Sequence, residues 1–309
     1  MTAASAPVRE RPPRGRVHRG RVNTRRLAPY LFLLPNMLIF AVFTIWPALN
    51  GFNLSFYDSS NGRTFKPVGT GNYSAILSDE EFWAVVRHTL VYTVGFVLIS
   101  TVLAMALALM INAQRRGRGA ISAAYFLPIV ISPVVVGIVW RAAFDRERGM
   151  VNQGLSAVGL GEPGWLVEPS LAMVAIIVVG TWIHLGFYAM ILMSGLQSID
   201  GSLYEAARID GTTTWQAIRL ITMPLLRPTL MVVVILATIA GFQSFDFIFT
   251  LTGGGPVSAT TLMVQYIYEN GFSYPIEYGL ASAAAVILFV VVFMVTFANY
   301  VLGRRSDSI

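Results

Sequence analysis

The sequence predicts an all-α polytopic membrane protein with six transmembrane helices, and its composition and patterning support this. Of the 309 residues, 55% are hydrophobic and only 12% are charged, with a mean hydropathy of +0.63. Soluble domains carry about 25% charged residues. The hydrophobic residues lie in long uncharged blocks, and about 20 such residues form a helix that crosses the hydrocarbon core. An ordinary soluble enzyme is therefore excluded, and the absence of cysteine excludes disulfides, thiolate nucleophiles and cysteine-ligated metals.

The predicted spans lie between charged residues, because an ionised group at the bilayer centre costs at least about 2.5–3.5 kcal/mol. The six uncharged windows are residues 27–57, 88–114, 119–140, 169–199, 228–245 and 278–303. A seventh uncharged stretch, 247–268, contains three consecutive glycines followed by Pro256, so one helix there could not satisfy its backbone in lipid. We expect a helix end and a loop in that stretch.

The distribution of positive charge predicts that both termini are cytoplasmic. Sixteen of the 22 basic residues lie in the segments 1–26, 114–119 and 200–227 or after residue 303, whereas the opposite side carries six basic and eleven acidic residues. We divide the chain into a basic cytoplasmic tail (1–26), a six-span domain (27–303) with a cytoplasmic loop at 200–227, and a short cytoplasmic tail (304–309). The arginines of the first tail have no aromatic residues among them, which favours contact with anionic lipid over nucleic acid.

Signatures of catalysis are missing from the sequence. His18, His88 and His184 are far apart and have no acidic or histidine partner at helical spacing, so no metal site is predicted. The glycine run before Pro256 lacks the Lys-Ser/Thr of a phosphate-binding loop. We therefore predict no catalytic residue, no cofactor and no metal, and any ATP hydrolysis would take place on another chain.

The most informative segment is the cytoplasmic loop between the fourth and fifth windows. It carries E-A-A-x-x-x-G, nine further residues and then I-x-M-P, and it resembles the E-A-A-x-x-x-G-x(9)-I-x-L-P signature of ABC importer permeases, with Met223 replacing leucine. The residues that this resemblance assigns to coupling with an ATPase are Glu205, Ala206, Ala207, Asp210, Gly211, Ile221 and Pro224.

The resemblance implies the type I ABC importer permease (MetI-like) fold, in which this loop forms two short helices that dock in a groove of a separate ATPase subunit. The residue types suit that role, because alanine and glycine allow a partner to approach closely and Glu205 offers a charge-assisted hydrogen bond. From the residues alone, an amphipathic surface helix that ends at Gly211 is the alternative.

Further segments resemble the carbohydrate-uptake permeases of this family. They are residues 29–35 with Pro47, Gly71-Asn72-Tyr73 with Asp79 and Phe82-Trp83, Phe245-Asp246, and residues 251–256. This resemblance implies a multi-pass subunit of the bacterial cytoplasmic (inner) membrane. Its implied partners are ABC ATPase subunits, a second homologous permease chain in a heterodimer, and an extracellular or periplasmic solute-binding protein. The family usually has proline where Asp200 stands.

A candidate solute path follows from polar residues near the predicted spans. Asp246 directly follows the fifth span on the outer side, and helical spacing places Phe242 and Gln243 on the same face one turn earlier. This face would contact sugar, or Asp246 would be solvated at the outer interface. In the fourth span, Trp182 and Tyr188 lie near His184, for which core packing and a helix–helix hydrogen bond are the ordinary explanation.

The predicted function is a transmembrane subunit of an ATP-driven importer for a sugar or a glycerol-phosphate-like solute. The absence of arginine within the spans favours a neutral sugar. An ion-coupled secondary transporter is the alternative, but it would need ionisable residues in the middle of a span, and a membrane-bound enzyme ranks lower still.

Overall fold

The computed structural model describes residues 24–59, 61–113 and 118–306. The first 23 residues, most of the predicted basic turn at 114–119 and the last three residues lie outside this part, so the predicted charge distribution there is not described. The chain divides into two units, Met1–Asn50 and Gly51–Ile309. The described part of the first unit is helical: α1 (Thr24–Phe40), a π-helical turn η1 (Ala41–Ile45) and the start of α2 (Trp46–Leu54). These helices correspond to the predicted span 27–57.

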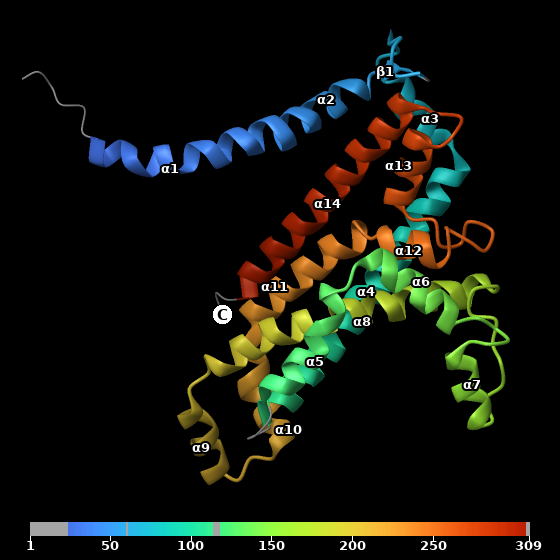
Figure 1. Cartoon of the computed structure of the whole chain (residues 1–309). Coiled ribbons are helices and arrows are strands. Elements are labelled where there is room, and N and C mark those ends of the chain that lie inside the picture. The colour runs from blue at the N-terminus through green and yellow to red at the C-terminus, as the bar shows by residue number, and fades with distance from the viewer. Residues whose placement is uncertain (1–23, 60, 114–117, 307–309) are drawn as a thin grey trace, which may run out of the picture. The chain divides into compact units, whose positions relative to one another are not determined.

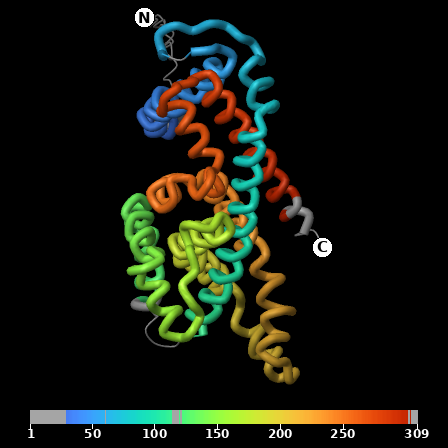
Figure 2. The backbone as a smooth tube through the Cα atoms, turned by 90° about the vertical axis from the view of Figure 1, so that its right-hand side faces the viewer, coloured from blue at the N-terminus to red at the C-terminus, as the bar shows by residue number. Residues whose placement is uncertain are grey.

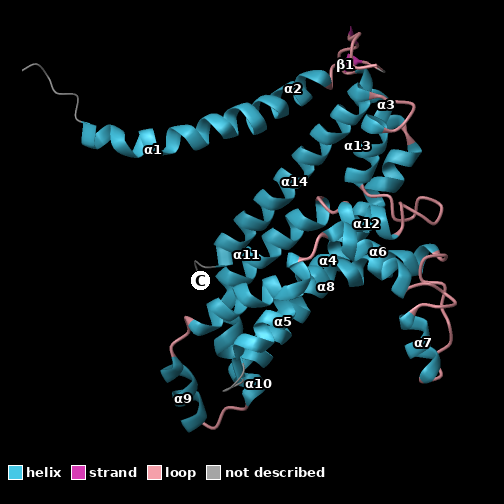
Figure 3. Ribbon diagram, in the orientation of Figure 1, coloured by secondary structure: helices cyan, strands magenta, loops and turns pink. Residues whose placement is uncertain are grey.

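The second unit is also mostly helical (Figures 1 and 3). Its elements are β1 (Tyr57–Asp58), β2 (Lys66–Pro67), α3 (Gly71–Ser78), α4 (Glu80–Ala113), α5 (Arg118–Val130), α6 (Pro133–Ala143), α7 (Met150–Ala157), α8 (Pro169–Gln197), α9 (Gly201–Ile209), α10 (Thr214–Ala217), η2 (Ile218–Thr222), α11 (Met223–Phe242), α12 (Asp246–Leu251), α13 (Met263–Phe272) and α14 (Tyr278–Ser306). The strands β1 and β2 form an antiparallel pair, with Tyr57 opposite Pro67.

The long helix α4 is the centre of this unit. It packs against α8 and α11, while α5 packs on α8 and α14 on α11; Figure 2 shows α4 running through the unit beside these helices. The core between them contains Phe96, Ile176, Leu192 and Leu226, all fully buried. Side chains at the outer surfaces of the long helices are apolar and exposed, as expected of helices that face lipid.

Five helices in the described residues are long and apolar enough to cross a membrane, or six if one bent pair counts as a span. The predicted windows at 88–114, 169–199 and 278–303 correspond to α4, α8 and α14. The fifth window, 228–245, corresponds to the later part of a longer helix. The helix begins at Thr214 and continues through η2 and α11 to Phe242, with Pro228 in its interior.

The third window, 119–140, is not one straight helix, and this corrects the prediction. The chain bends by 102° between α5 and α6. Ser132 has extended backbone angles (φ −55°, ψ 126°), and Pro133 occupies the start of α6. The residue before a proline is disfavoured in helical conformation, and a proline at the first helical position needs no N–H partner, so this sequence ends one helix and starts the next.

The exit of the fifth span also differs from the prediction. After α11 ends at Phe242 the backbone leaves the helix, and a separate six-residue helix, α12, begins at Asp246. The stretch 247–268 contains the end of α12 and a loop, as expected, but the loop ends at Leu262 because α13 begins at Met263.

Asn72 joins three elements near the start of the second unit. Its side-chain Nδ2 donates to the backbone oxygens of Ser55 (2.8 Å) and Tyr57 (2.9 Å), and the hydroxyl groups of Tyr73 and Ser55 lie 2.7 Å apart. The Gly-Asn-Tyr segment thus ties α3 to the hairpin and to the end of α2.

Candidate functional site

The loop between α8 and α11 forms a short helix, α9, whose start is fixed by Asp200. This side chain accepts a hydrogen bond from the backbone N–H of Ser202 (2.9 Å), as an N-cap does. Hydrogen bonds from the Ser202 backbone and hydroxyl lower the pKa of the Asp200 carboxyl group. Aspartate at the position where the family usually has proline therefore still starts a helix, by capping it.

The end of α9 is fixed by Gly211. This residue has a φ of 75°, in the left-handed region that glycine adopts without steric cost. Its N–H donates to the oxygen of Arg208 (3.1 Å), and the N–H of Thr212 donates to the oxygen of Ala207 (3.0 Å). These two bonds form a Schellman motif, so the glycine of the signature is needed for the sharp turn out of α9.

The second short helix expected in this loop is not separate, which corrects the prediction. Thr213 and Gln216 form a capping box at the start of α10, and from Thr214 the helix continues without interruption into the fifth span. A π-helical turn, η2, precedes Pro224, which lies at the start of α11 and has no N–H to donate. The loop is therefore one short helix followed by the cytoplasmic end of a long one.

The signature residues occupy different environments. Glu205, Ala206, Asp210 and Pro224 are exposed, whereas Ala207 is only 7% exposed. The expectation that Ala207 offers close approach to a partner is thus wrong for this side chain, because the chain's own bundle covers it. Signature residue Ile221 is half-buried.

Large apolar side chains in the same segment are also exposed. Ile209 is 87% exposed, Trp215 70% and Leu220 65%. Apolar side chains this exposed on polar loop segments are typical of surfaces that bind a partner. The sequence prediction named none of these three, although their position inside the signature was a signal.

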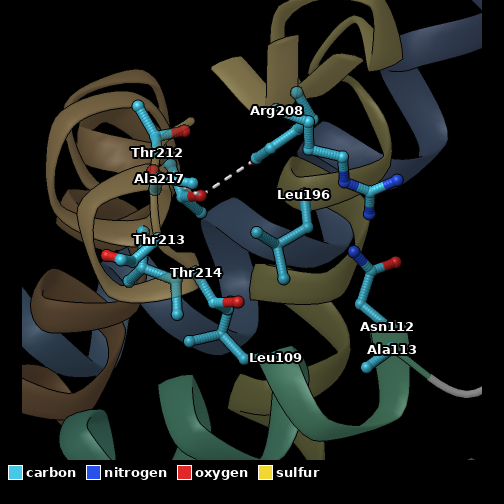
Figure 4. A pocket seen from close by; sticks show the side chains of 12 residues that line it. Leu109, Asn112, Ala113, Leu196, Arg208, Thr212, Thr213, Thr214 and Ala217 are labelled. Atoms are coloured by element: carbon cyan, nitrogen blue, oxygen red, sulfur yellow. Dashed lines mark hydrogen bonds between the residues drawn. The ribbon is translucent and has the colours of Figure 1, made fainter. Parts of the chain in front are cut away.

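A pocket of about 300 Å³ separates this loop from the ends of α4 and α8 (Figure 4). Figure 4 shows Arg208 and Asn112 on one side of it, and Thr212, Thr213 and Thr214 on the other. Within the loop, a hydrogen bond of 2.9 Å between the hydroxyl groups of Tyr204 and Thr222 joins α9 to η2 beside this pocket.

The candidate path residues near Asp246 do not share one helical face. The helix is interrupted at Ser244 and Phe245, and Phe245 has non-helical angles (φ −149°, ψ −61°). Gln243 and Asp246 are exposed, but Phe242 is 4% exposed. The expectation from helical spacing is therefore wrong at Phe242.

A buried polar and aromatic cluster lies beside this break. The Tyr92 hydroxyl of α4 lies 3.1 Å from the Ser244 hydroxyl. Ser244 donates its only hydroxyl hydrogen to the Ala240 oxygen (2.8 Å), so the Tyr92 hydroxyl is the donor to Ser244. Phe96 stacks on Tyr92 and contacts the rings of His184 and Tyr188. The sequence prediction missed Tyr92 and Ser244, which are separated by 152 residues.

The two aromatic residues predicted in the fourth span lie in different places. Tyr188 is 1% exposed and stacks on His184, whereas Trp182 is 36% exposed and packs edge-on against Trp140 of α6. His184 Nδ1 lies 2.9 Å from the Gly180 oxygen of its own helix, so the expected helix–helix hydrogen bond is instead an intrahelical one. Because a carbonyl only accepts, Nδ1 carries the proton.

Comparison with known proteins identifies the family. The model of the family described as "Binding-protein-dependent transport system inner membrane component" matches residues 97–308. The chain is 35% identical over 283 residues to the trehalose/maltose transport system permease protein MalF of Thermococcus litoralis, covering 90% of this chain and 94% of that protein. It is 34% identical over 281 residues to the lactose transport system permease protein LacF of Rhizobium radiobacter, covering 89% and 94%.

A solved structure gives the same result for the fold. A chain of a bacterial alginate ABC transporter, in complex with an alginate pentasaccharide-bound periplasmic protein, superposes with a TM-score of 0.79 at 27% identity, over 91% of this chain and 96% of that chain. With the interrupted helices and the loop between α8 and α11, these matches show that the chain belongs to the family of binding-protein-dependent transport system inner membrane components.

Proposed function

We propose that this chain forms half of the translocation path of an ATP-driven saccharide importer, and that the loop 200–227 couples it to a separate ATPase subunit. The saccharide class is supported by the relatives, which are named for trehalose/maltose and lactose transport, and by the alginate transporter. The other proposed components are a second permease chain, two ATPase subunits and a periplasmic or extracellular binding protein that delivers the solute.

The observation that carries the coupling role is the set of exposed apolar side chains in the loop that contains Glu205. Ile209, Trp215 and Leu220 are mostly solvent-exposed on a loop whose helix is capped at both ends. A loop that displays an aromatic anchor and the carboxylates of Glu205 and Asp210 is suited to transmit a displacement, because force applied to it moves the long helix that follows. From Thr214 the chain is helical through the π-helical turn into α11.

The proposed orientation places this loop and both termini in the cytoplasm, with 27–303 as the membrane domain. The orientation can be tested directly because the sequence contains no cysteine, so an introduced cysteine is the only thiol of this chain. In intact cells, a membrane-impermeant maleimide should label Thr64→Cys, in the exposed turn between β1 and β2, and should leave Ser202→Cys unlabelled until the cells are permeabilised. Labelling of Ser202→Cys in intact cells would contradict the orientation.

The coupling role is tested with Glu205→Ala and Trp215→Ala in the reconstituted transporter. Removing one partner of a buried charged pair at an interface costs about 2–5 kcal/mol, so we expect at least about tenfold less ATPase subunit retained on purification, and a matching loss of uptake. Met223→Leu, which restores the family residue with similar volume, is the control and should leave both unchanged. Full retention and uptake in both loop variants would refute the role.

A further inference from the structure

The pocket of about 300 Å³ beside the loop lies on the side of α9 that faces the bundle (Figure 4). Tyr204 and Arg208 are one helical turn apart on α9 and both line it, and Ala207 next to them is buried. Glu205 and Ile209 are exposed further round the same helix and are not among the residues that line the pocket. The pocket is therefore distinct from the surface of the proposed ATPase contact.

The wall of the pocket opposite α9 is apolar. Leu109 and Ala113 come from the end of α4 and Leu196 from the end of α8, and Ala217 and Ile218 extend this apolar lining along the start of the fifth span. Cavities of about 300–1,000 Å³ that combine an apolar lining with a few polar groups are typical of small-molecule sites. A ligand of this pocket is therefore expected to have an apolar portion.

The charge in the pocket is positive. Among the described residues that line it, Arg208 is the one charged side chain, and no carboxylate is present. Thr214 lies across the pocket from Arg208 (Figure 4) and carries a hydroxyl group. The planar guanidinium group of arginine binds phosphate through two parallel hydrogen bonds, so this pair of side chains suits a phosphate group.

The position of the pocket along the spans favours the same kind of ligand. It lies where α4 and α8 end, which on the proposed orientation is the cytoplasmic surface of the membrane. The sequence directly after Ala113 adds Arg115, Arg116 and Arg118 to the positive charge of this side. Basic pockets between transmembrane helices on the cytoplasmic side bind phospholipid head groups in other proteins.

We propose that this pocket binds a phosphate ester that has an apolar portion. Its phosphate group pairs with Arg208 and accepts a hydrogen bond from the Thr214 hydroxyl, and its apolar portion packs on Leu109 and Leu196. A phospholipid of the cytoplasmic leaflet and a soluble alkyl phosphate share this chemistry.

A bound ligand would restrain the loop. The hydroxyl groups of Tyr204 and Thr222, which join α9 to η2, belong to residues that line the same pocket. An occupant that contacts α9, α4 and α8 together therefore limits the movement of α9 relative to the ends of the two long helices. The consequence for ATPase coupling rests on the proposed function, whereas the binding itself does not.

The test is native mass spectrometry of the purified full chain, in a detergent without phosphate, with dioleoyl phosphatidylglycerol and dioleoylglycerol as probes. We expect one phosphatidylglycerol to bind with a Kd at least about tenfold lower than that of dioleoylglycerol, which has the same acyl chains and no phosphate. Arg208→Gln should weaken phosphatidylglycerol binding about tenfold, and Arg208→Lys, which keeps the charge, should restore part of it. Arg219→Gln is the matched control, because Arg219 is an exposed basic residue of the same segment that is not among the pocket-lining residues.

A second variant tests the cavity rather than the charge. Ala113 is exposed at the edge of the pocket, so Ala113→Phe fills space there and should also weaken binding while Arg208 is unchanged. Butyl phosphate identifies the source of the ligand. Displacement of phosphatidylglycerol by butyl phosphate would support the site with a soluble ester as its ligand, and retention of the lipid would support the site with phospholipid as its ligand.

Three results would overturn the proposal: equal affinity in Arg208→Gln and the wild type, equal weakening by Arg219→Gln, or dioleoylglycerol binding as tight as that of phosphatidylglycerol. Hydrogen exchange at the amides of α9 should slow when phosphatidylglycerol is bound, and unchanged exchange would overturn the restraint on the loop. These measurements use the chain without ATPase subunits. Failure of the pocket and failure of the coupling role, which is measured with Glu205→Ala, therefore give different results.

Discussion

Replacing Gly211 with alanine isolates the contribution of one backbone conformation to the loop between α8 and α11. With its φ of 75°, Gly211 lies in the left-handed region, and no atom would lie within 4 Å of an added Cβ. The substitution therefore meets no neighbouring side chain, and its whole effect comes from the backbone. An L-residue in this conformation costs about 1–2 kcal/mol, which destabilises the Schellman turn that ends α9.

Hydrogen exchange measures this effect at the amides of residue 211 and Thr212, whose N–H groups bond to the Arg208 and Ala207 oxygens. A loss of about 1–2 kcal/mol corresponds to roughly 5–30-fold faster exchange there. Gly201→Ala is the matched control, because Gly201 starts the same helix, has equally open space around it and is not among the residues with positive φ. Exchange at Thr212 that is unchanged in Gly211→Ala, or equally accelerated in Gly201→Ala, would refute the reasoning.

Three further substitutions test the packing of the second unit, each read as a shift in the thermal unfolding of the purified chain. Gly137→Ala places a methyl group against the Thr250 side chain and should destabilise by about 1–3 kcal/mol, while Gly154→Ala, which faces open space, should not. Asn72→Ala removes two hydrogen bonds to backbone oxygens and should cost about 1–3 kcal/mol, and Asn72→Asp, without the N–H donors, should not rescue it. Tyr92→Phe should cost only about 0.5–1.5 kcal/mol because the ring still packs and Ser244 keeps its bond to Ala240; a larger loss would contradict the assignment of Tyr92 as donor.

The long apolar helices were predictable because charge placement and hydropathy act locally along the chain. The windows around α4, α8 and α14 could be predicted from one fact alone, the high cost of burying an ion in lipid. The breaks were harder, since proline has different effects in different places. Pro35 and Pro228 lie inside helices, whereas Pro133 begins one after a 102° bend. Whether a freed backbone group finds a partner depends on neighbouring helices, which the local sequence does not contain.

The end of α9 at Gly211 was predictable because the glycine conformation of a turn acts within a few positions of the chain. The cap at Asp200 was not predicted, because the sequence there departs from the pattern that the loop resembles. The path residues were not predictable in the same way. The helix breaks at Ser244 without a glycine or proline at the break, and Ser244's partner Tyr92 comes from another helix. Burial of Ala207 likewise depends on tertiary packing.

The broken third span contacts α12, the helix that follows the fifth span, and this contact bears on the predicted solute path at Gln243 and Asp246. The α6 half of the broken third span packs against α12, and the Thr250 hydroxyl of α12 lies 3.2 Å from the Val134 oxygen near the start of α6, with the Asp246 oxygen of its own helix at 3.1 Å. Irregular backbone within a membrane is tolerated only where protein buries it or where it lines a water-filled cavity. The α6–α12 contact buries one side of this irregular backbone. The exposed side of the same break, with Gln243 and Asp246, is then expected to face water, which supports the proposal that solute passes there.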